Sequence, residues 1–140
     1  MKTLRLIPIF ALALLTSACA STIGQMRGES PSERYRQYAG EPIERFTAFD
    51  ITGWTPVSRN ELVVWTGVND AYLVKVWDTC RDLQFAERIG VTRTANSVSK
   101  FESVRVGRDR CPINEIRPID VKQMKADRAA ATAVGSGPRD

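Results

Sequence analysis

The three cysteines are the residues of this 140-residue chain whose type and spacing point most directly to chemistry. Cys19 follows an apolar run near the N-terminus, whereas Cys80 and Cys111 lie in the second half of the chain. The sequence contains no histidine, which excludes Ser-His-Asp catalysis, Cys-His catalysis and zinc sites that use histidine. The remaining possible roles of the cysteines are lipidation, disulfide formation and redox exchange.

Residues 1–19 have the organisation of an export signal. Lys2 and Arg5 form a basic start, and residues 6–15 form an apolar run interrupted only by Pro8. An apolar run of about ten residues is too short to span a bilayer core of roughly 30 Å as a helix. The segment is therefore predicted to be a cleaved signal peptide.

The end of this signal resembles a bacterial lipobox, with the sequence Leu-Thr-Ser-Ala-Cys at residues 15–19. Thr16 departs from the Leu that such motifs prefer. Cleavage by ordinary signal peptidase after Ala20, giving a mature chain from residue 21, is the alternative. We expect lipidation of Cys19, because ordinary cleavage would discard a cysteine to no purpose. The resemblance further implies sorting to the outer membrane, because the residue after the cysteine is not Asp.

Cys80 and Cys111 remain after processing, and an even pair in an oxidising periplasm predicts a disulfide. Closing a loop of about thirty residues contributes on the order of 3–4 kcal/mol, mainly by restricting the unfolded chain. A redox-active pair is the alternative. That alternative lacks a Cys-x-x-Cys motif, and arginines beside the cysteines do not by themselves make a thiolate reactive.

The other residue types that carry catalysis form no recognisable motif. The carboxylates have no spacing that fixes an acid/base pair, and the serines lack a Gly-x-Ser-x-Gly elbow. No EF-hand spacing and no glycine-rich phosphate loop occurs in the sequence. We therefore predict no catalytic residue, no metal site and no cofactor. An enzyme with a carboxylate site in a cleft of the domain is the alternative.

Two groups of side chains are candidates for a binding surface. The possible anion-binding patch consists of Arg105, Arg108, Arg110 and Arg117. It would suit lipid headgroups or phosphorylated sugars, whereas the simpler interpretation is a solvated face. The possible sugar-stacking platform consists of Trp54, Trp65 and Trp77, which could equally belong to the core or its rim.

The net charge gives little information about partners. It is +4 for the whole chain, with 20 basic against 16 acidic side chains. Removing Lys2 and Arg5 with the signal leaves 18 against 16, so the mature chain carries +2. This small charge and the exported location predict no nucleic-acid partner.

The chain around these residues divides into a tether, a domain and a tail. Residues 20–44 are polar and rich in Gly and Pro, and predict a tether that is either largely disordered or interrupted by one short helix. Tyr35 and Tyr38 would share one face of that helix and dock on the domain. The residues that favour the helix are Ser30 or Ser32 as a cap, Pro31 and Glu33. Residues 122–140 predict a marginal helix, capped by Asp120, and a disordered tail.

Residues 45–121 show the period-two alternation of short strands and predict a disulfide-stapled, mainly β domain (α+β at most). Five to six strands would form a small antiparallel barrel or sandwich. A hairpin turn is expected at Asn69-Asp70, and Pro112 and Pro118 suggest that the last strand lies at a sheet edge. A short helix is expected over residues 82–89, and a polar loop over residues 93–100. The expected strands are residues 46–51, 62–66, 72–77, 101–106 and 111–119, with extended structure also resuming at residues 91–92.

Several of these residues resemble a domain-of-unknown-function family of small proteobacterial lipoproteins. The resemblance covers about residues 46–120. It rests on Val63-Val64-Trp65-Thr66-Gly67 with Ala71-Tyr72-Leu73-Val74, on Cys80 before Asp82-Leu83, and on Arg110-Cys111-x-Ile113-x-Glu115-Ile116-Arg117-Pro118-x-Asp120. It implies exported lipoproteins with a paired cysteine, and it assigns no activity.

Together, the signal and the missing catalytic motifs predict a non-enzymatic binding or structural module of the cell envelope. We expect it on the periplasmic side of the outer membrane, or alternatively soluble in the periplasm or secreted. Its expected partners are the membrane, through the lipid anchor, and an envelope protein or a glycan.

Overall fold

The computed structural model describes residues 30–78 and 80–135, and residues 1–29, 79 and 136–140 lie outside the described residues. Two α-helices, α1 (Pro31–Arg36) and α2 (Val121–Gly135), flank the strands, and a 3₁₀ turn, η1 (Leu83–Phe85), interrupts them. The strands are β1 (Arg45–Thr47), β2 (Gly53–Ser58), β3 (Glu61–Trp65), β4 (Asp70–Val76), β5 (Ile89–Val91), β6 (Ser97–Ser99), β7 (Ser103–Val106) and β8 (Asp109–Asp120).

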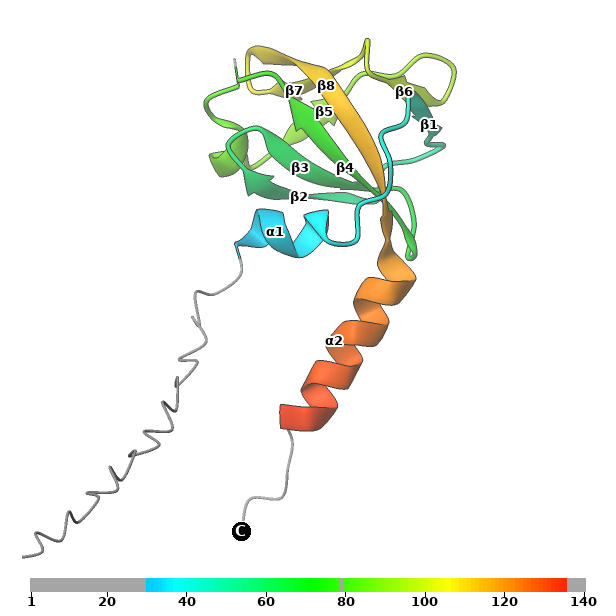
Figure 1. Cartoon of the computed structure of the whole chain (residues 1–140). Helices are drawn as coiled ribbons and strands as arrows, with labels where there is room; N and C mark the ends of the chain where they lie inside the picture. The colour runs from blue at the N-terminus through cyan, green and yellow to red at the C-terminus, as the bar shows by residue number, and fades with distance from the viewer. Residues whose placement is uncertain (1–29, 79, 136–140) are drawn as a thin grey trace, which may run out of the picture.

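Six of the strands form one antiparallel sheet in the order β2-β3-β4-β8-β7-β5, which curls into a half-barrel (Figure 1). β1 and β6 form a separate two-stranded sheet, in which Phe46 lies opposite Val98. The prediction of a mainly β, antiparallel domain is therefore confirmed.

The main hydrophobic core lies on the face of the sheet that we call the inner face, which β1, β6 and η1 cover. Leu62 and Val64 of β3 are completely buried there, as are Val74 and Val76 of β4. These residues alternate along their strands because successive side chains of a strand point to opposite faces. The intervening Val63 is also completely buried, on the opposite face, so β3 is apolar on both faces.

The second core lies on the outer face of the sheet, which α1 and α2 cover. Val63 and Leu73 from the sheet meet Val121 and Met124 from the first turns of α2. Tyr35 and other partly buried residues of the N-terminal segment pack against this cluster. Docking of Tyr35 and Tyr38 on the domain is thus confirmed.

Both helices begin at the predicted caps. The Ser30 side chain accepts a hydrogen bond from the Glu33 N–H, and the Glu33 carboxylate accepts one from the Ser30 N–H. Asp120 accepts a hydrogen bond from the N–H of Gln123 at the start of α2, at 2.9 Å. The two helices lie on the same side of the domain, and the β7–β8 hairpin lies at the far end from α2 (Figure 1).

The described part of the predicted tether is folded against the domain. After α1, the chain runs beside β8 and donates backbone hydrogen bonds from Gly40 to Pro118 and from Ile43 to Ile116, each at 2.8 Å. In return, the Asp120 N–H donates to the Tyr38 carbonyl at 2.9 Å. The folded structure therefore begins by residue 30 rather than at residue 45. Residues 20–29 of the predicted tether lie outside the described residues.

The strand predictions near the N-terminal side of the domain were only partly right. The predicted strand at residues 46–51 ends at Thr47, and β2 (residues 53–58) was not predicted. β2 was missed because Pro56 interrupts its pattern. It tolerates that proline because it is the edge strand of the sheet. The predicted loop at residues 93–100 contains β6, reached through a turn in which Ala95 and Asn96 both have positive φ.

The predicted hairpin between β3 and β4 is confirmed, but the backbone conformation of its turn differs from the expected one. Neither Asn69 nor Asp70 has a positive φ. Instead, the Asp70 carbonyl accepts backbone hydrogen bonds from Thr66 and Gly67. The turn is thus closed by the carbonyl of its last residue rather than by a left-handed conformation.

The two-turn helix predicted over residues 82–89 is wrong. The chain makes only the 3₁₀ turn η1 and then enters β5, where Ile89 lies opposite Val106 of β7. Leu83 is completely buried in the inner core. A two-turn helix is only marginally stable alone, so burial of Leu83 and pairing with β7 decide the local structure.

The expectation that Pro112 and Pro118 mark a sheet edge is also wrong, because β8 lies between β4 and β7. In an extended strand, the N–H and C=O of one residue point to the same side. The Pro118 carbonyl faces Gly40, and the Pro112 carbonyl faces Trp77, just beyond the end of β4. Each missing N–H therefore points at irregular backbone instead of removing a bond between two strands.

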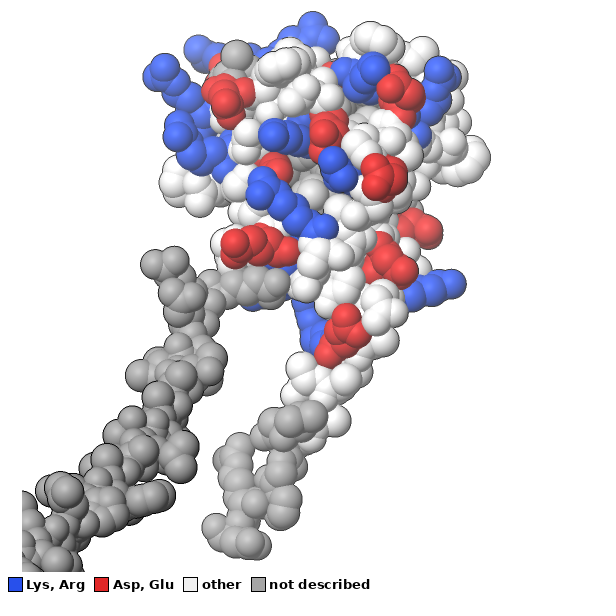
Figure 2. Space-filling view, viewed as in Figure 1, with Lys and Arg blue, Asp and Glu red and all other residues white. Residues whose placement is uncertain are grey.

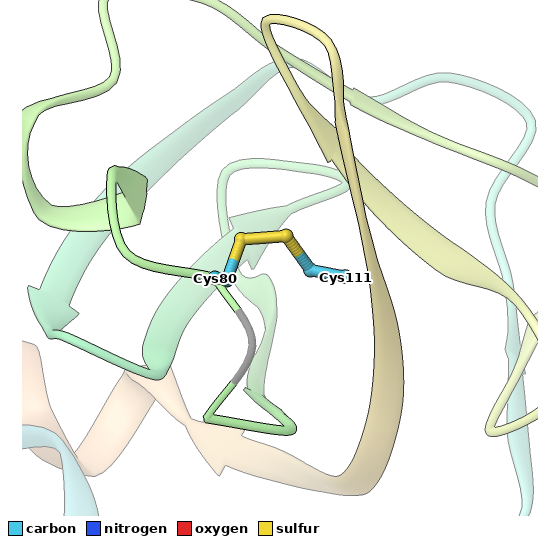
Figure 3. Close-up of a disulfide and its surroundings, with 2 residues drawn as sticks. All are labelled: Cys80 and Cys111. Atoms are coloured by element: carbon cyan, nitrogen blue, oxygen red, sulfur yellow. A yellow bond between two sulfur atoms is a disulfide. The ribbon is translucent and has the colours of Figure 1, made fainter.

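A disulfide joins the connection after β4 to the central strand β8 (Figure 3). Cys80 and Cys111 have their Cα atoms 5.4 Å apart, and both side chains are buried in the inner core. Cys111 also lies opposite Val104 of β7. The disulfide predicted from the sequence is present, and it fastens the η1 segment to the middle of the sheet.

Replacing both cysteines by Ala should lower the free energy of unfolding by about 3–4 kcal/mol, because the unfolded chain loses its closed loop. Chemical denaturation followed by tryptophan fluorescence measures this loss. Reductant should destabilise the wild-type protein and leave the double variant unaffected. Equal stability of the two oxidised proteins would contradict a stabilising role for the disulfide.

Candidate functional site

The β7–β8 hairpin places three of the predicted arginines together. Gly107, with φ of +57°, and Arg108 form its two-residue turn. Arg105 and Arg110 lie directly opposite each other on the two strands. Directly opposed residues have Cβ atoms about 4.5–5.5 Å apart, so two guanidinium groups share a small area.

These arginine side chains are exposed on the outer face. Val104, Val106 and Cys111 point to the inner core, so Arg105 and Arg110 between or beside them point outward. In the described part of the chain, no hydrogen bond or ion pair joins the side chains of Arg105, Arg108 or Arg110 to another residue. We call these three residues the hairpin arginines. Figure 2 shows basic side chains gathered at the end of the domain away from α2.

Arg117 does not belong with them. It lies seven residues further along β8, opposite Leu73 of β4, which corresponds to roughly 20 Å along a strand. Its guanidinium donates to Glu115 at 2.5 Å and to the Gly40 carbonyl at 3.2 Å. The hydrogen bond to Glu115 raises the pKa of Arg117 further above its usual range. The structure thus divides the predicted patch into three unpaired arginines and one paired arginine.

A pocket of about 450 Å³ opens beside the hairpin arginines, at the mouth of the half-barrel. It lies between the chain around η1 and the tip of the hairpin, with the nearly buried Val106 among its lining residues. Phe85 contributes an aromatic ring that is 78% exposed. The charged lining residues are Asp82, Glu87, Arg88, Arg108 and Asp109.

The pocket brings three carboxylates together, although in a mixed-charge setting. Asp82, Glu87 and Asp109 share the mouth with Arg88 and Arg108. Across residues 30–78 and 80–135, no three His, Cys, Asp or Glu side chains are grouped as ligands for a metal ion. The inner core behind the pocket is apolar. The carboxylates of this pocket therefore lie at its rim and not in the inner core.

The three tryptophans do not form a common platform. Trp54 lies opposite Val64 and so faces the inner side, whereas Trp65 packs against the outer cluster. The Trp65 indole donates a hydrogen bond to Thr55 at 3.2 Å. Trp77 follows β4 and is 55% exposed. A sugar ring could meet only one of these indoles at a time.

A buried carboxylate that the sequence analysis missed holds α1 against the sheet. Glu61, at the start of β3, is only 3% exposed. It accepts hydrogen bonds from the Ser32 hydroxyl at 2.6 Å and from the Arg36 guanidinium at 2.6 and 3.2 Å. Ser58 donates a fourth hydrogen bond at 3.3 Å. Only tertiary structure reveals this site, because the donors on α1 lie 25 and 29 residues before Glu61.

The pKa of Glu61 reflects two opposing effects. Burial raises the pKa, whereas the hydrogen bonds from Ser32 and Arg36 lower it. The hydrogen bonds outweigh burial, so the pKa of Glu61 lies below its usual value of 4.5. Lys75 lies directly opposite Glu61, and Glu115 directly opposite Lys75, which makes a row of alternating charge across β3, β4 and β8. The hydrogen bonds from Ser32 and Arg36 give Glu61 a structural role, which is to hold α1 against β3.

A second acidic network stabilises the loop between β5 and β6. Glu102 accepts hydrogen bonds from the hydroxyls of Thr92 and Thr94. These hydrogen bonds lower the pKa of Glu102, and the charge of Arg110 contributes a smaller effect in the same direction. Arg110 is therefore within electrostatic range of one carboxylate that already has two hydrogen-bond donors.

The fold and the surface together define a small, disulfide-containing, mainly β domain with two helices on the outer face of its sheet. The chain belongs to a family of unknown function, DUF6491, which matches residues 1–135. No curated protein matches the chain, and no solved structure matches it. The predicted resemblance to a family without an assigned activity is thus confirmed.

The disulfide indicates an oxidising location outside the cytoplasm. Within the described ranges, no helix combines the length and the apolar content needed to cross a bilayer. Cys19, the predicted lipidation site, lies outside the described residues.

Replacing Glu61 by Gln should lower the free energy of unfolding by about 2 kcal/mol at neutral pH, because Arg36 loses its buried partner. The pKa of Glu61 is lower in the folded protein than in the unfolded chain. The stabilisation is therefore fully present above pH 4.5 and is lost as the pH falls through the folded pKa. Denaturation of both proteins between pH 3 and pH 7 measures the difference.

Glu87→Gln is the matched control, because Glu87 is an exposed carboxylate. Its variant should follow the wild-type stability at each pH. A difference between wild type and Glu61→Gln that does not shrink in acid would contradict the role of the Glu61 carboxylate.

Proposed function

We propose that this protein is an exported, lipid-anchored envelope protein that acts as a non-enzymatic binding or structural module. Lipidation of Cys19 would place the domain on the periplasmic side of the outer membrane. The membrane is then one partner, and an envelope protein or a glycan is the other. This function needs no cofactor, no metal and no nucleic acid.

The observation that carries the proposal is how the domain separates apolar from charged groups. Among the described residues, the inner face of the half-barrel is filled by apolar side chains and by the disulfide. The hairpin arginines lie on the outer face, and the charged residues of the pocket lie at its rim. Such a surface supports recognition of a partner better than it supports chemistry in an enclosed site.

The arrangement of the helices supports a tethered domain. The described chain enters at α1, beside α2, while the β7–β8 hairpin, which carries the hairpin arginines, lies at the far end (Figure 1). The eleven Cα–Cα steps from Cys19 to Ser30 span at most about 40 Å when fully extended. An anchor at Cys19 would thus keep the α1 side near the membrane and allow the hairpin arginines to face the periplasm.

The pocket at the mouth supports a second candidate function, a periplasmic enzyme with a carboxylate site. Asp82, Glu87 and Asp109 line this pocket together, and the exposed ring of Phe85 could stack on a sugar. Hydrolysis of a glycan by a carboxylate pair would need one protonated and one ionised member. The pocket offers the residue types for this reaction in one open site.

The membrane anchor can be tested by replacing Cys19 with Ser. The variant should leave the lipid-containing membrane fraction, because a diacylated cysteine supplies the anchoring hydrocarbon. Cell fractionation and immunoblotting measure the distribution. Gln25→Ala is the control, because it changes a residue of the predicted tether and leaves both the lipobox and the disulfide intact. Unchanged membrane association of Cys19→Ser would refute lipidation as the anchor.

The second candidate function predicts glycan cleavage that depends on the mouth. The purified full-length protein would be incubated with isolated cell-wall glycan, and released fragments would be identified by mass spectrometry. If the protein is a non-enzymatic module, neither the wild type nor the Asp82→Asn/Asp109→Asn variant should release glycan fragments. Release by wild type that falls at least about 100-fold in the variant would favour the enzyme instead.

A further inference from the structure

The strand β5 leaves one side of its backbone without a partner. It is the last strand of the six-stranded sheet and pairs only with β7. The Thr92 N–H donates to the Ser103 carbonyl at 2.9 Å, so Thr92 and Gly90 direct their backbone groups toward β7. Antiparallel geometry then directs the backbone groups of Ile89 and Val91 toward the open edge. Among the described residues, no backbone hydrogen bond on that edge reaches them.

The outer face beside this edge carries a row that crosses three strands. Gly90 of β5 lies opposite Arg105 of β7, and Arg105 lies opposite Arg110 of β8. A strand added at the edge of β5 would place one residue beside Gly90, two strand spacings from Arg105, or about 9.5 Å. Because Gly90 has no side chain, a carboxylate from that strand could extend across it toward the guanidinium of Arg105.

Charge determines which strand fits. Like charges directly opposite each other destabilise a sheet, and Arg105 and Arg110 have no ion-pair partner among the described residues. Arg88 precedes β5 and adds a further exposed positive charge at this edge. An acidic strand would satisfy the guanidinium groups and the open backbone together, whereas a basic or apolar strand would satisfy only the backbone.

We propose that the edge of β5 binds an extended acidic segment of a partner protein by strand addition, with Arg105 holding a carboxylate of that segment and Arg110 adding positive charge to the same row. The main-chain hydrogen bonds to Ile89 and Val91 provide affinity, and the arginine row provides selectivity for acidic side chains. This inference rests on the proposed function as a binding module and specifies its partner. An anionic membrane surface would use the same arginines but has no strand to pair with β5.

The first test measures charge recognition. Fluorescein-labelled poly-L-glutamate is titrated with the processed full-length protein in a neutral detergent, and fluorescence anisotropy reports binding. We expect Arg105→Gln/Arg110→Gln to weaken binding about ten-fold, because one charge-assisted contact and the neighbouring positive charge are lost. Arg59→Gln/Arg128→Gln removes the same charge from exposed arginines elsewhere and should bind as wild type does. Equal weakening by both pairs would overturn the proposal.

The second test measures strand addition. Val91→Pro removes an outward N–H without taking a donor from the β5–β7 pairing, and it should weaken binding about ten-fold. Val91→Ala keeps that N–H and is the matched control. Gly90→Val is a further variant that should fold, because its Cβ would lie 3.8 Å from the Arg105 Cβ, an ordinary contact. Its side chain should obstruct the path to Arg105, so it should also weaken binding.

The two tests separate the possible outcomes. Binding of poly-L-glutamate that is lost in the arginine pair and in Gly90→Val supports strand addition. If Gly90→Val and Val91→Pro both bind poly-L-glutamate with the wild-type affinity, strand addition is overturned. If the arginine pair then also loses binding to phosphatidylglycerol vesicles, the hairpin arginines recognise an anionic surface instead. The membrane fractionation of Cys19→Ser is an independent experiment. The proposed lipid anchor can therefore be refuted without refuting strand addition, and strand addition can be refuted without refuting the anchor.

Discussion

The structure depends on β8, the twelve-residue strand at the centre of the sheet. One part of β8 pairs with β4 from Ile113 to Asp120, and its beginning pairs with β7. Its other side accepts backbone hydrogen bonds from Gly40 and Ile43, and Cys111 on this strand forms the disulfide. The strand continues directly into α2. Because β8 contacts both ends of the described chain, it combines local hairpins of short strands into one cooperative unit.

The geometry of β8 also sorts the side chains between the two faces. Cys111, Ile113 and Ile116 contribute to the inner core, whereas Ile119 contributes to the outer cluster. The pairing with β4 shifts register between Lys75 and Val76, which lets two odd-numbered residues and one even-numbered residue share the inner face. Outward positions along the same strand receive the charged residues. The paired Arg117 lies where β8 is flanked by β4 and the N-terminal segment, and the hairpin arginines lie where β8 extends beyond β4.

Much of the fold was readable from local patterns. The alternation around Leu62–Trp65 and Tyr72–Val76 predicted β3 and β4, and the caps at Ser30 and Asp120 predicted both helices. The errors occur where a distant partner overrides the local pattern. Residues 82–89 have helical spacing, yet Ile89 pairs with β7 and Leu83 is buried in the core. β2 contains a proline and becomes a strand because β3 offers it a partner.

The sequence by itself determined the chemistry that this protein can use. The absence of histidine, the number of cysteines and the signal-like N-terminus do not depend on folding, because they are properties of residue types and order. Only the tertiary structure decided which charges are free. Arg36 pairs with the buried Glu61, 25 residues away, and Arg117 pairs with Glu115, while Arg105 and Arg110 remain exposed. Charge pairing depends on distance in space, and those distances are set by the packing of α1 against β3 and by the pairing of β7 with β8.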